Sequence, residues 1–393
     1  MNGGDASGAR CSGWRLIAGY LGVVLMLIGG NHSAAPAGAG AYPGKQFGPV
    51  CFLVPGVGAV LAGYLFYLLI RGREKLRLCG RQDALIVVCS WILAILFCAI
   101  PFQMTGQYNL TQAVFECTSG WSTTGLSVVD VEQCPRIFLM FRSIMLFFGG
   151  VGLVLVMVSV LSDRHGMRLY SAEGHSDRLL PNLVKSARMI IAIYTGYILS
   201  GTFLYMVFGM DWFDALNHSI AALSTGGFST RAESIGYYNS AAIEAVTIVL
   251  MLLGCTNFLA HLYLIRGKFG NFFQYCEVKF QLFVCALFTP VLAVFLVLGG
   301  FAGGVGQGLR DGIFQAATAL TTTGFQTVPS FAVWSSPLIL LMTLLMLIGG
   351  GTGSTAGGIK QIRVCIALKS LCWSLRARIT QKRTIHADAL RKL

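Results

Sequence analysis

Three short segments of this sequence combine hydroxyl side chains with glycine in nearly the same order. They are residues 122–127 (STTGLS), 224–229 (STGGFS) and 321–326 (TTTGFQ), which we call turn 1, turn 2 and turn 3. The three align without a gap and recur roughly every 100 residues, as expected of one structural unit used several times. Backbone carbonyls and hydroxyl groups gathered around an axis replace the water shell of a cation. The pattern therefore predicts an ion pathway.

The three residues at the centre of each turn are the candidate selectivity filter. These residues are Thr123, Thr124 and Gly125; Thr225, Gly226 and Gly227; and Thr322, Thr323 and Gly324. The last glycine of each set adopts backbone angles closed to other residues, so that carbonyls face the axis. We expect the first threonine of each set to brace the turn or to give potassium an oxygen ligand at the lower edge. Phe228 and Phe325 are expected to pack behind the filter.

Each turn occupies the same place between two apolar spans. A short, weakly apolar segment precedes it, at residues 113–121, 212–223 and 311–320. We interpret these segments as half-helices that enter the membrane from outside and direct their partly negative C-terminal ends toward its middle. Irregular backbone at that depth is tolerated only where it lines a cavity or is buried in protein. The expected unit is helix, re-entrant half-helix, turn and helix.

Residues 349–358 (GGGTGSTAGG) interrupt the last apolar segment, and we call them the glycine loop. Their six glycines cannot hold a helix, since each costs about 1 kcal/mol relative to alanine. A phosphate-binding loop is excluded because the required Gly-Lys-Ser/Thr ending is absent. A flexible linker outside the membrane is the alternative to an unwound intramembrane loop, which we favour as a gate below the filter. The candidate gating residues are Gly349, Gly350, Gly351, Thr352, Gly353, Ser354, Thr355, Gly357 and Gly358.

The composition excludes an ordinary soluble domain. Apolar residues make up 55% of the 393 residues and charged residues only 11%. Long, nearly uncharged runs recur along the chain, and the hydrocarbon core of a bilayer selects such runs of about 20 residues. We therefore predict an all-α integral membrane protein with about eight spans. These spans are expected at residues 14–30, 49–70, 84–104, 137–161, 189–209, 240–264, 280–301 and 336–375.

The net charge of +13 is concentrated in alternate loops. Basic clusters follow the second, fourth and sixth expected spans and fill the tail at residues 376–393. This positive-inside pattern places the N-terminus and these loops in the cytoplasm, and it explains the charge without a nucleic-acid partner. The opposite loops carry the acidic residues Asp130, Glu132, Asp211, Asp214, Glu233 and Asp311. They form either a mildly acidic outer mouth that concentrates cations or ordinary solvated loops.

Several polar and sulfur-containing residues receive structural interpretations. Asn257 and His261 lie four residues apart on one face of a span, where an interhelical hydrogen bond is favoured over ion contact. Arg142 is expected to snorkel or to pair with a carboxylate such as Glu116. The twelve cysteines are scattered without metal-ligand spacing, which favours small apolar residues over disulfides or a zinc site.

The N-terminal apolar run allows two interpretations. Basic residues, the apolar stretch 16–28 and small residues thereafter fit a cleaved signal peptide. A second apolar span follows closely and the chain then stays in the membrane, which favours a retained helix.

The motifs together resemble the Trk/Ktr/HKT superfamily of potassium transporters, nearest its bacterial Trk branch. The resemblance runs from about residue 14 to the C-terminus. It rests on the three turns, the glycine loop with Ile359-Lys360, Phe141-Arg142-Ser143 with Gly149-Gly150, Asn257-Phe258 with His261, and Tyr170-Ser171-Ala172-Glu173.

The resemblance implies a potassium uptake subunit of the bacterial inner membrane, with potassium as substrate and no cofactor in the chain. It implies four helix–pore–helix repeats in a pseudo-fourfold array, after an extra helix pair. It also implies a homodimer gated through the glycine loop by cytoplasmic nucleotide-binding regulatory subunits. In this family a serine in place of the first filter glycine goes with sodium preference, so Gly125 implies potassium.

The resemblance divides the chain into a helix pair with its loop (1–83), three pore repeats (84–188, 189–279 and 280–375) and a basic cytoplasmic tail (376–393). The family continues into a fourth repeat, whereas this sequence ends at Leu393. An incomplete pseudo-fourfold arrangement is therefore expected. A potassium-translocating subunit is the leading hypothesis. The alternatives are a sodium-permeable relative and a truncated, non-conducting remnant that needs a fourth repeat from another chain. The six histidines are dispersed, so no enzyme is expected.

Overall fold

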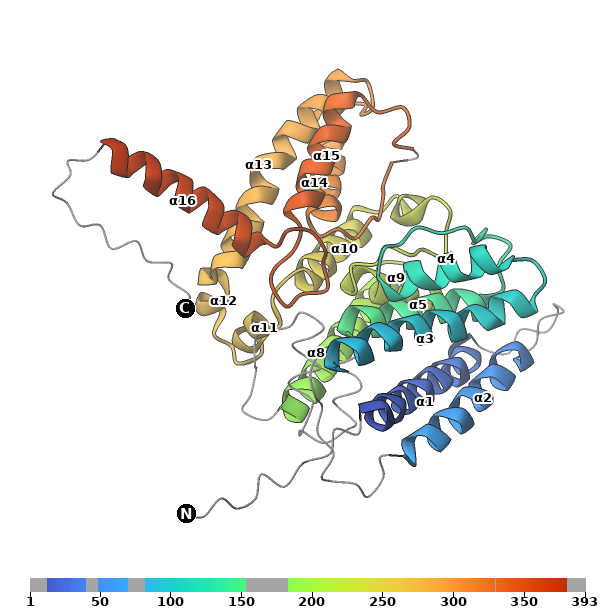
Figure 1. The fold of residues 1–393 in the computed structure, drawn as a ribbon. Coiled ribbons are helices and arrows are strands. Elements are labelled where there is room, and N and C mark those ends of the chain that lie inside the picture. Colours follow the sequence, from blue (N-terminus) through green and yellow to red (C-terminus); the bar gives the residue numbers. More distant parts are fainter. Residues whose placement is uncertain (1–12, 40–48, 70–81, 153–182, 329, 380–393) are drawn as a thin grey trace, which may run out of the picture. The chain divides into compact units, whose positions relative to one another are not determined.

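The computed structural model describes residues 13–39, 49–69, 82–152, 183–328 and 330–379. All regular elements in these ranges are helices (Figure 1). The α-helices are α1 (Gly13–Ala39), α2 (Val50–Tyr67), α3 (Gln82–Met104), α4 (Leu110–Trp121), α5 (Arg136–Val151), α8 (Leu183–Val207), α9 (Trp212–Leu223), α10 (Ala241–Gly254), α11 (Phe258–Ile265), α12 (Phe269–Gln274), α13 (Cys276–Leu298), α14 (Val305–Leu320), α15 (Ser336–Ile348) and α16 (Gln361–Ile379). A short 3-10 helix, η1 (Ser234–Tyr238), precedes α10.

The chain divides into two compact units. The first comprises Met1–Ser122 and Leu126–Ile191, and the second comprises Thr123–Gly125 and Ala192–Leu393. The centre of turn 1 therefore groups with the second unit, although the helices on either side of it belong to the first.

The first unit is built from α1 to α5. Helices α1 and α2 pack closely because glycines face the opposite backbone: a Cβ atom on Gly22 or Gly63 would collide with the other helix. Close backbone approach at small residues is a usual way for helices to associate in a membrane. Aromatic rings fill the space between α2, α3 and α5, where the ring centres of Phe52 and Phe138 lie 4.8 Å apart.

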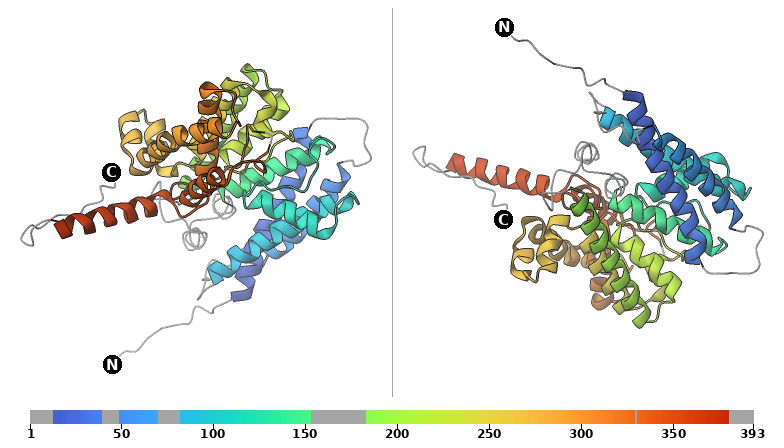
Figure 2. Two further views of the ribbon diagram at one scale, coloured as in Figure 1. Left: turned by 90° about the horizontal axis from the view of Figure 1, so that it is seen from above. Right: turned by 90° about the horizontal axis from the view of Figure 1, so that it is seen from below.

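The second unit contains helices α9 to α16 and the part of α8 from Ala192 onward. Helices α13, α14 and α15 lie side by side in Figure 1, and Figure 2 (left) shows them grouped when seen from above; they enclose an apolar core that includes Leu296, Leu320 and Leu338. Hydrogen bonds join α8 to its neighbours. The Ser219 hydroxyl on α9 donates to the Ile198 carbonyl at 2.8 Å, and the hydroxyls of Tyr205 and Thr247 lie 2.7 Å apart.

Five helices in the described ranges are long and apolar enough to cross a membrane, and a bent pair adds a sixth. The five correspond to the expected spans 14–30, 49–70, 84–104, 189–209 and 280–301. The expected span 240–264 is not one straight helix, because α10 and α11 meet at an angle of 116°. This prediction from apolar length alone was wrong about the break at residues 255–257.

The two other expected spans differ from continuous helices in the described residues. Helix α5 ends at Val151, and the rest of the segment 137–161 from residue 153 lies outside the described residues, as do residues 380–393 of the basic tail and the Tyr170–Glu173 motif. The expected interruption of the segment 336–375 is present, because α15 stops at Ile348 and α16 begins only at Gln361. The glycine loop joins these two helices.

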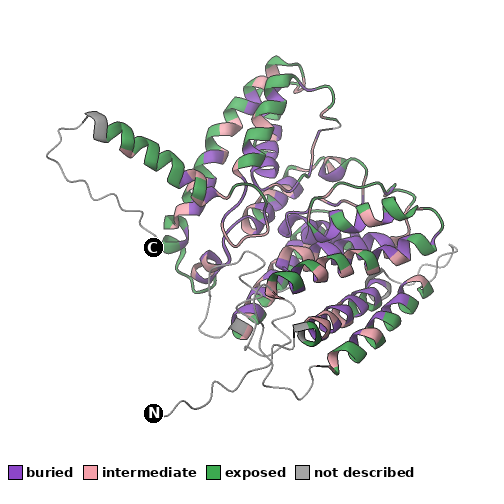
Figure 3. Ribbon diagram, viewed as in Figure 1, coloured by how far each residue is buried: buried purple, intermediate pink, exposed green. Residues whose placement is uncertain are grey.

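The long helices carry exposed residues along one face (Figure 3), and many of these residues are large and apolar. Examples are Leu65 on α2, Phe283 on α13 and Leu340 on α15, each more than half exposed. Exposed apolar surface on this scale is unfavourable in water but suits contact with lipid. The described helices thus form a multi-pass membrane protein.

Candidate functional site

A long helix, a short helix, a turn and a further helix follow one another three times in the structure. The short helices α4, α9 and α14 each end at the residue directly before turns 1, 2 and 3. The second was predicted at its observed bounds, Trp212–Leu223, whereas α4 and α14 begin three and six residues before the predicted starts at 113 and 311. The order of elements predicted from the sequence is therefore present in the structure.

Turns 2 and 3 terminate their helices by the same hydrogen-bonding pattern. The amide of Gly226 donates to the Ala221 carbonyl at 2.9 Å, and the amide of Thr323 donates to the Thr318 carbonyl at 3.0 Å. One residue earlier, Thr225 and Thr322 donate to carbonyls three residues behind them. This is a Schellman motif, in which the residue after the cap takes the left-handed conformation and is usually glycine.

Threonine occupies that left-handed position in all three turns. The φ angles of Thr123, Thr225 and Thr322 are 52°, 51° and 53°. A left-handed backbone costs an L-residue roughly 1–2 kcal/mol, and a branched side chain such as threonine is an outlier there. Strain of this kind persists only where the surrounding structure enforces it, and it is concentrated at functional sites. The sequence predicted special backbone angles for the glycines but not for these threonines.

The glycine two residues later is also left-handed in each turn. The φ angles of Gly125, Gly227 and Gly324 are 82°, 67° and 89°. Each turn therefore reverses its carbonyl direction twice within three residues, which only glycine permits without strain at the second position.

The three turns stand in a row. A Cβ atom added to Gly125 would collide with the carbonyl oxygen of Gly226, and one added to Gly227 would collide with the carbonyl oxygen of Thr323. Beyond Gly324, a Cβ atom would meet no described atom within 4 Å. Turn 1 thus contacts turn 2, turn 2 contacts turn 3, and the far side of turn 3 is open among the described residues.

The central residues of the middle turn are more buried than those of the two outer turns. In turn 2 the backbone residues Thr225 and Gly226 are buried, whereas Thr124 in turn 1 and Gly324 in turn 3 are exposed. The large side chains behind the turns behave as predicted: Phe228 and Phe325 are buried, and the Phe325 ring lies 5.8 Å from the ring of His218.

A buried polar side chain on each short helix holds the chain just after its turn. The three occupy equivalent positions, nine residues before the last glycine of the turn: Glu116, His218 and Gln315. The Ser127 hydroxyl donates to Glu116 at 2.9 Å, and the Ser229 hydroxyl lies 2.9 Å from His218 Nε2. Gln315 Nε2 donates to the Thr327 hydroxyl at 3.4 Å. Turns 2 and 3 are therefore fixed on both sides, by their helix ends and by this brace.

The brace in the first unit is an ion pair. Arg142 Nε on α5 donates to Glu116 Oε1 at 2.6 Å, and both side chains are almost fully buried, at 2% and 1% exposed. The same guanidinium donates to the Ser127 hydroxyl at 2.9 Å. The predicted pairing of Arg142 with Glu116 is confirmed. A buried charge at this depth requires such a partner.

Two of the acidic residues counted with the outer loops lie on the short helices, within the predicted segments 212–223 and 311–320. Asp214 lies in the first turn of α9 and Asp311 in α14, and both are buried. Asp214 accepts hydrogen bonds from Thr230 at 2.7 Å, from Arg231 at 2.8 Å and from Tyr238 at 2.8 Å. Burial by itself would raise the pKa of Asp214, but these donors lower it below its ordinary value. Asp214 therefore secures the segment after turn 2.

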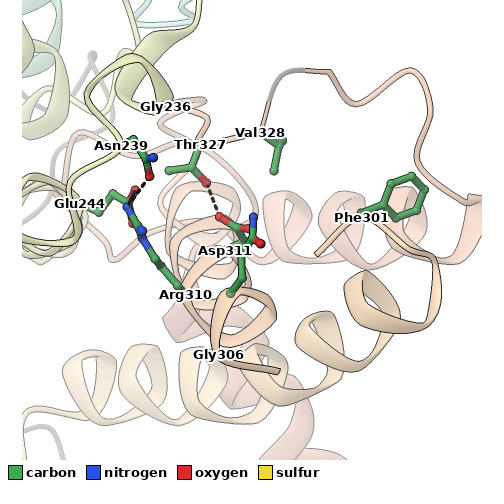
Figure 4. Close-up of a pocket in the computed structure, with 10 residues that line it drawn as sticks. Gly236, Asn239, Glu244, Phe301, Gly306, Arg310, Asp311, Thr327 and Val328 are labelled. Carbon is green, nitrogen blue, oxygen red and sulfur yellow. Dashed lines mark hydrogen bonds and ion pairs between the residues drawn. The ribbon is translucent and has the colours of Figure 1, made fainter. Parts of the chain in front are cut away.

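A polar cavity of about 540 Å³ lies behind the residues that follow turn 3 (Figure 4). Arg310 on one wall donates to both oxygens of Glu244, at 2.7 and 2.8 Å. Asp311 accepts from the Thr327 hydroxyl at 3.1 Å, and burial raises the pKa of Asp311. These contacts tie α14 to α10 and to the chain leaving turn 3.

The glycine loop lies against turns 2 and 3. The Thr355 hydroxyl lies 3.0 Å from the Thr225 hydroxyl and donates to the carbonyl that ends α9, Leu223, at 3.2 Å. The amide of Gly357 donates to the Thr322 hydroxyl at 2.8 Å. The structure thus brings together two sets of residues that the sequence singled out separately. The hydroxyls of Thr225 and Thr322 thus contact the glycine loop.

The glycine loop is hydrogen-bonded to the break between α10 and α11. The amide of Gly351 donates to the Cys255 carbonyl at 2.9 Å, and the amide of Phe258 donates to the Gly353 carbonyl at 3.2 Å. Asn257 caps α11 by accepting from the Leu259 amide at 2.7 Å. His261 does form the predicted interhelical contact, 3.2 Å from the Tyr197 hydroxyl on α8.

Several residues of the site could not be selected from one sequence without the structure. The braces Glu116, His218 and Gln315 differ in chemistry, and only their equal offset from the glycines relates them. Glu277, which contacts the glycine loop, lies 75 residues from it. Aligning the three repeats on their glycines is the signal that would have found the braces.

Comparison with known proteins agrees with this architecture. The TrkH family model, described as a cation transport protein, matches residues 68–392. The Trk system potassium uptake protein TrkH of Escherichia coli K12 is 30% identical over 391 residues, which cover 96% of this chain and 78% of that protein. TrkH of Halomonas elongata is 35% identical over 318 residues, which cover 78% of this chain and 65% of the relative. This chain therefore spans about two thirds of the length of that relative.

A solved structure is also similar. The crystal structure of the potassium transporter TrkH from Vibrio parahaemolyticus superimposes with a TM-score of 0.82 at 26% sequence identity. The match covers 96% of this chain and 78% of the other chain. Sequence and fold agree over nearly the whole chain, and the family consists of transporters rather than enzymes. The chain belongs to the TrkH family of cation transport proteins.

Proposed function

We propose that this chain is a potassium-translocating subunit of the bacterial inner membrane, and that turns 1, 2 and 3 form three sides of its selectivity filter in an incomplete pseudo-fourfold array. The names of its relatives, which include several Trk system potassium uptake proteins, support potassium as the cargo. Potassium is a substrate here, and the proposal includes no cofactor.

The observation that carries the proposal is the repeated backbone geometry. Three turns share a left-handed threonine and a left-handed glycine two residues later, and the first two glycines each back onto a carbonyl of the next turn. Each turn also lies at the C-terminal end of a short helix, which carries a partial negative charge. A row of turned carbonyls at helix C-termini favours a dehydrated cation over other ligands.

In this proposal potassium contacts the carbonyl oxygens of the central residues of each turn. The contributing residues are Thr123, Thr124, Gly125, Thr225, Gly226, Gly227, Thr322, Thr323 and Gly324. The threonine hydroxyls at the first position of each set serve the lower edge. Gly125 favours potassium over sodium by the family resemblance.

The glycine loop is proposed as the gate. Its hydrogen bonds to Thr225 and Thr322 place it directly against the threonines that would form the lower edge of the filter. A loop in this position obstructs an ion that leaves the filter, and it must move for the ion to pass. Backbone without regular structure, rich in glycine, suits such a movement.

We further propose the assembly that the family resemblance implies. The subunit would form a homodimer and would be regulated by cytoplasmic nucleotide-binding subunits of the Trk/Ktr type. The basic residues of the predicted cytoplasmic loops provide a surface for such a partner or for anionic lipid headgroups.

The test is rubidium or potassium uptake in a host that lacks its own potassium uptake systems. Expression of the chain should restore growth at low potassium, and excess sodium should not compete with uptake. Gly227→Ala should abolish uptake at equal protein level, because the added Cβ atom collides with the next turn. Uptake unchanged in this variant would contradict the filter, and sodium competition would support the sodium-permeable alternative.

A second candidate follows from the open side of turn 3. Beyond Gly324 a Cβ atom would meet no described neighbour within 4 Å, so a further segment is needed to complete a ring around an ion. In this case residues 1–393 conduct only when a further segment lies against the open side of turn 3. Liposomes that contain the purified chain would then show no potassium flux, and co-reconstitution with a fourth repeat of a relative would restore it.

A further inference from the structure

Glu277 is a buried carboxylate far from the three turns. It is the second residue of α13, and only 4% of its surface is exposed. Glutamate is almost never buried to this degree unless it has a partner. Its place in the first turn of a helix is favourable for a negative charge, but that alone does not explain the loss of contact with water.

Its partner is the glycine loop. Glu277 Oε1 accepts two hydrogen bonds from one residue, Thr352, at 2.9 Å from the amide and at 2.5 Å from the hydroxyl. Hydrogen bonds to a charged acceptor are stronger than those between neutral groups. The two donors on one residue also fix the orientation of the loop backbone at that point.

The loop is shaped to admit this carboxylate. A Cβ atom at Gly351 would lie 3.2 Å from Glu277 Oε2 and 3.1 Å from the Cys255 carbonyl oxygen, so a side chain there would push against the carboxylate. Among the described residues Oε2 has no hydrogen-bond partner. The carboxylate is therefore half satisfied, and its hold on the loop rests on Oε1 alone.

The remaining contacts of the loop are of other kinds. Backbone hydrogen bonds join Gly351 and Gly353 to the break between α10 and α11, and neutral hydroxyls join Thr355 and Gly357 to turns 2 and 3. Lys360, just after the loop, donates to the Ala356 carbonyl at 2.5 Å. Among the described residues, Glu277 is the carboxylate to which the loop donates hydrogen bonds.

We propose that Glu277 is the positioning residue that latches the glycine loop against turns 2 and 3. The inference rests on the proposed function only in assigning the loop to gating; the latch itself is a claim about loop position. Release of the two hydrogen bonds would free the Thr352 end of the loop, while the Thr355 end keeps its contacts with turn 2.

Hydrogen exchange of the full-length chain in detergent or nanodiscs tests the latch without requiring ion flux. Replacing a charge-assisted pair of hydrogen bonds should speed amide exchange within residues 349–358 by roughly ten- to hundred-fold. Glu277→Leu should show the full effect and Glu277→Gln a smaller one, because the neutral amide still accepts weakly. Glu277→Asp should not rescue protection fully, because its shorter side chain does not reach Thr352.

Two controls separate a latch from general loosening. Glu244→Gln changes another buried glutamate, on α10, which pairs with Arg310 rather than with the loop. It should leave exchange in 349–358 unchanged. Combining Glu277→Gln with Thr352→Val should add little to the effect of either change alone, since both act on one interaction.

Three results would overturn the proposal. They are unchanged exchange in the loop of a folded Glu277→Leu protein, a uniform rise across α13 and all other helices, and fully additive effects of Glu277→Gln and Thr352→Val. The proposed function fails separately: wild-type chain without potassium flux, but with loop exchange that depends on Glu277, contradicts permeation and leaves the latch intact. If wild-type chain conducts, Glu277→Gln should change its flux several-fold, and an unchanged flux in a variant whose loop exchange has risen contradicts the assignment of the loop to gating.

Discussion

The hydroxyl groups of Thr225 and Thr355 lie 3.0 Å apart, although 130 residues separate them in the sequence. Thr225 is the strained, left-handed residue of turn 2, and Thr355 belongs to the glycine loop. The contact joins the proposed filter to the proposed gate through two side chains. A change in the position of the loop therefore changes what surrounds the lower edge of the turns.

A disulfide between these positions should lock the loop. Thr225→Cys with Thr355→Cys is made in a chain whose Cys255, Cys276 and Cys365 are serine. Oxidation should cross-link the pair and reduce potassium uptake at least ten-fold, and a reductant should restore it. The single-cysteine variants serve as controls and should ignore the oxidant. Efficient cross-linking with full uptake would show that the loop need not move away from turn 2.

The three glycines should differ in their tolerance of alanine. All three have positive φ, which costs alanine roughly 1–2 kcal/mol. Gly125→Ala and Gly227→Ala add a collision with the next turn, whereas Gly324→Ala does not. The thermal unfolding midpoint in detergent should therefore fall further for the first two variants than for the third. Equal losses in all three would mean that the turns do not stand in the observed row.

Replacing only one member of the Glu116–Arg142 pair should strongly lower the stability of the protein. Arg142→Met leaves a buried carboxylate without its guanidinium, and breaking such a pair typically costs about 3–5 kcal/mol. The double variant Glu116→Gln with Arg142→Met removes both charges and should recover much of the loss. Chemical unfolding followed by tryptophan fluorescence measures both, because Trp121 ends the helix that carries Glu116. A double variant as unstable as Arg142→Met would argue that packing, rather than charge, is at stake.

Acid should weaken the segment after turn 2. The pKa of Asp214 is lowered in the folded chain, against an ordinary value of 3.8, because its hydrogen-bond donors outweigh the effect of burial. A lowered folded pKa stabilises the protein above the unfolded pKa, and this contribution disappears as the pH falls through the folded value. The midpoint temperature of thermal unfolding should therefore decrease as the pH falls below about 4. Asp214→Asn should be less stable at neutral pH and should lose this part of the acid dependence.

The sulfur atoms of Cys276 and Cys365 lie 3.7 Å apart, at the start of α13 and near the start of α16. An added disulfide-forming oxidant should join the two residues, and peptide mass spectrometry would detect the cross-link. Cys365→Ser should remove it, while Cys372→Ser, on the same helix but exposed, should not. Absence of the cross-link in the unmodified chain would contradict the packing of α16 against α13.

Much of the fold follows from the order of apolar runs. Six of the eight expected spans correspond to helices or a helix pair in the described residues, because lipid selects length and apolarity regardless of neighbours. The break at residues 255–257 was missed because apolar length does not reveal a bend. At this break the Gly351 amide of the glycine loop donates to the Cys255 carbonyl, a contact between residues far apart in the sequence.

Some residues of the candidate site could likewise be predicted from the sequence, and others could not. Gly125, Gly227 and Gly324 could be chosen from the sequence because a repeated glycine in a fixed context signals a special backbone. The burial of Asp214 and Asp311 was not predicted, since their partners Thr230 and Thr327 become neighbours only when each turn folds back along its helix.

The sequence by itself determined the membrane class, the three hydroxyl-and-glycine turns and the interruption of the last apolar segment, because each is a local property of composition and spacing. Tertiary structure alone decided that the turns form a row, that the loop meets Thr225 and Thr322, and that Glu277 holds Thr352. Such contacts join residues that are distant along the chain, and packing, which a single sequence does not record, brings them within hydrogen-bonding distance.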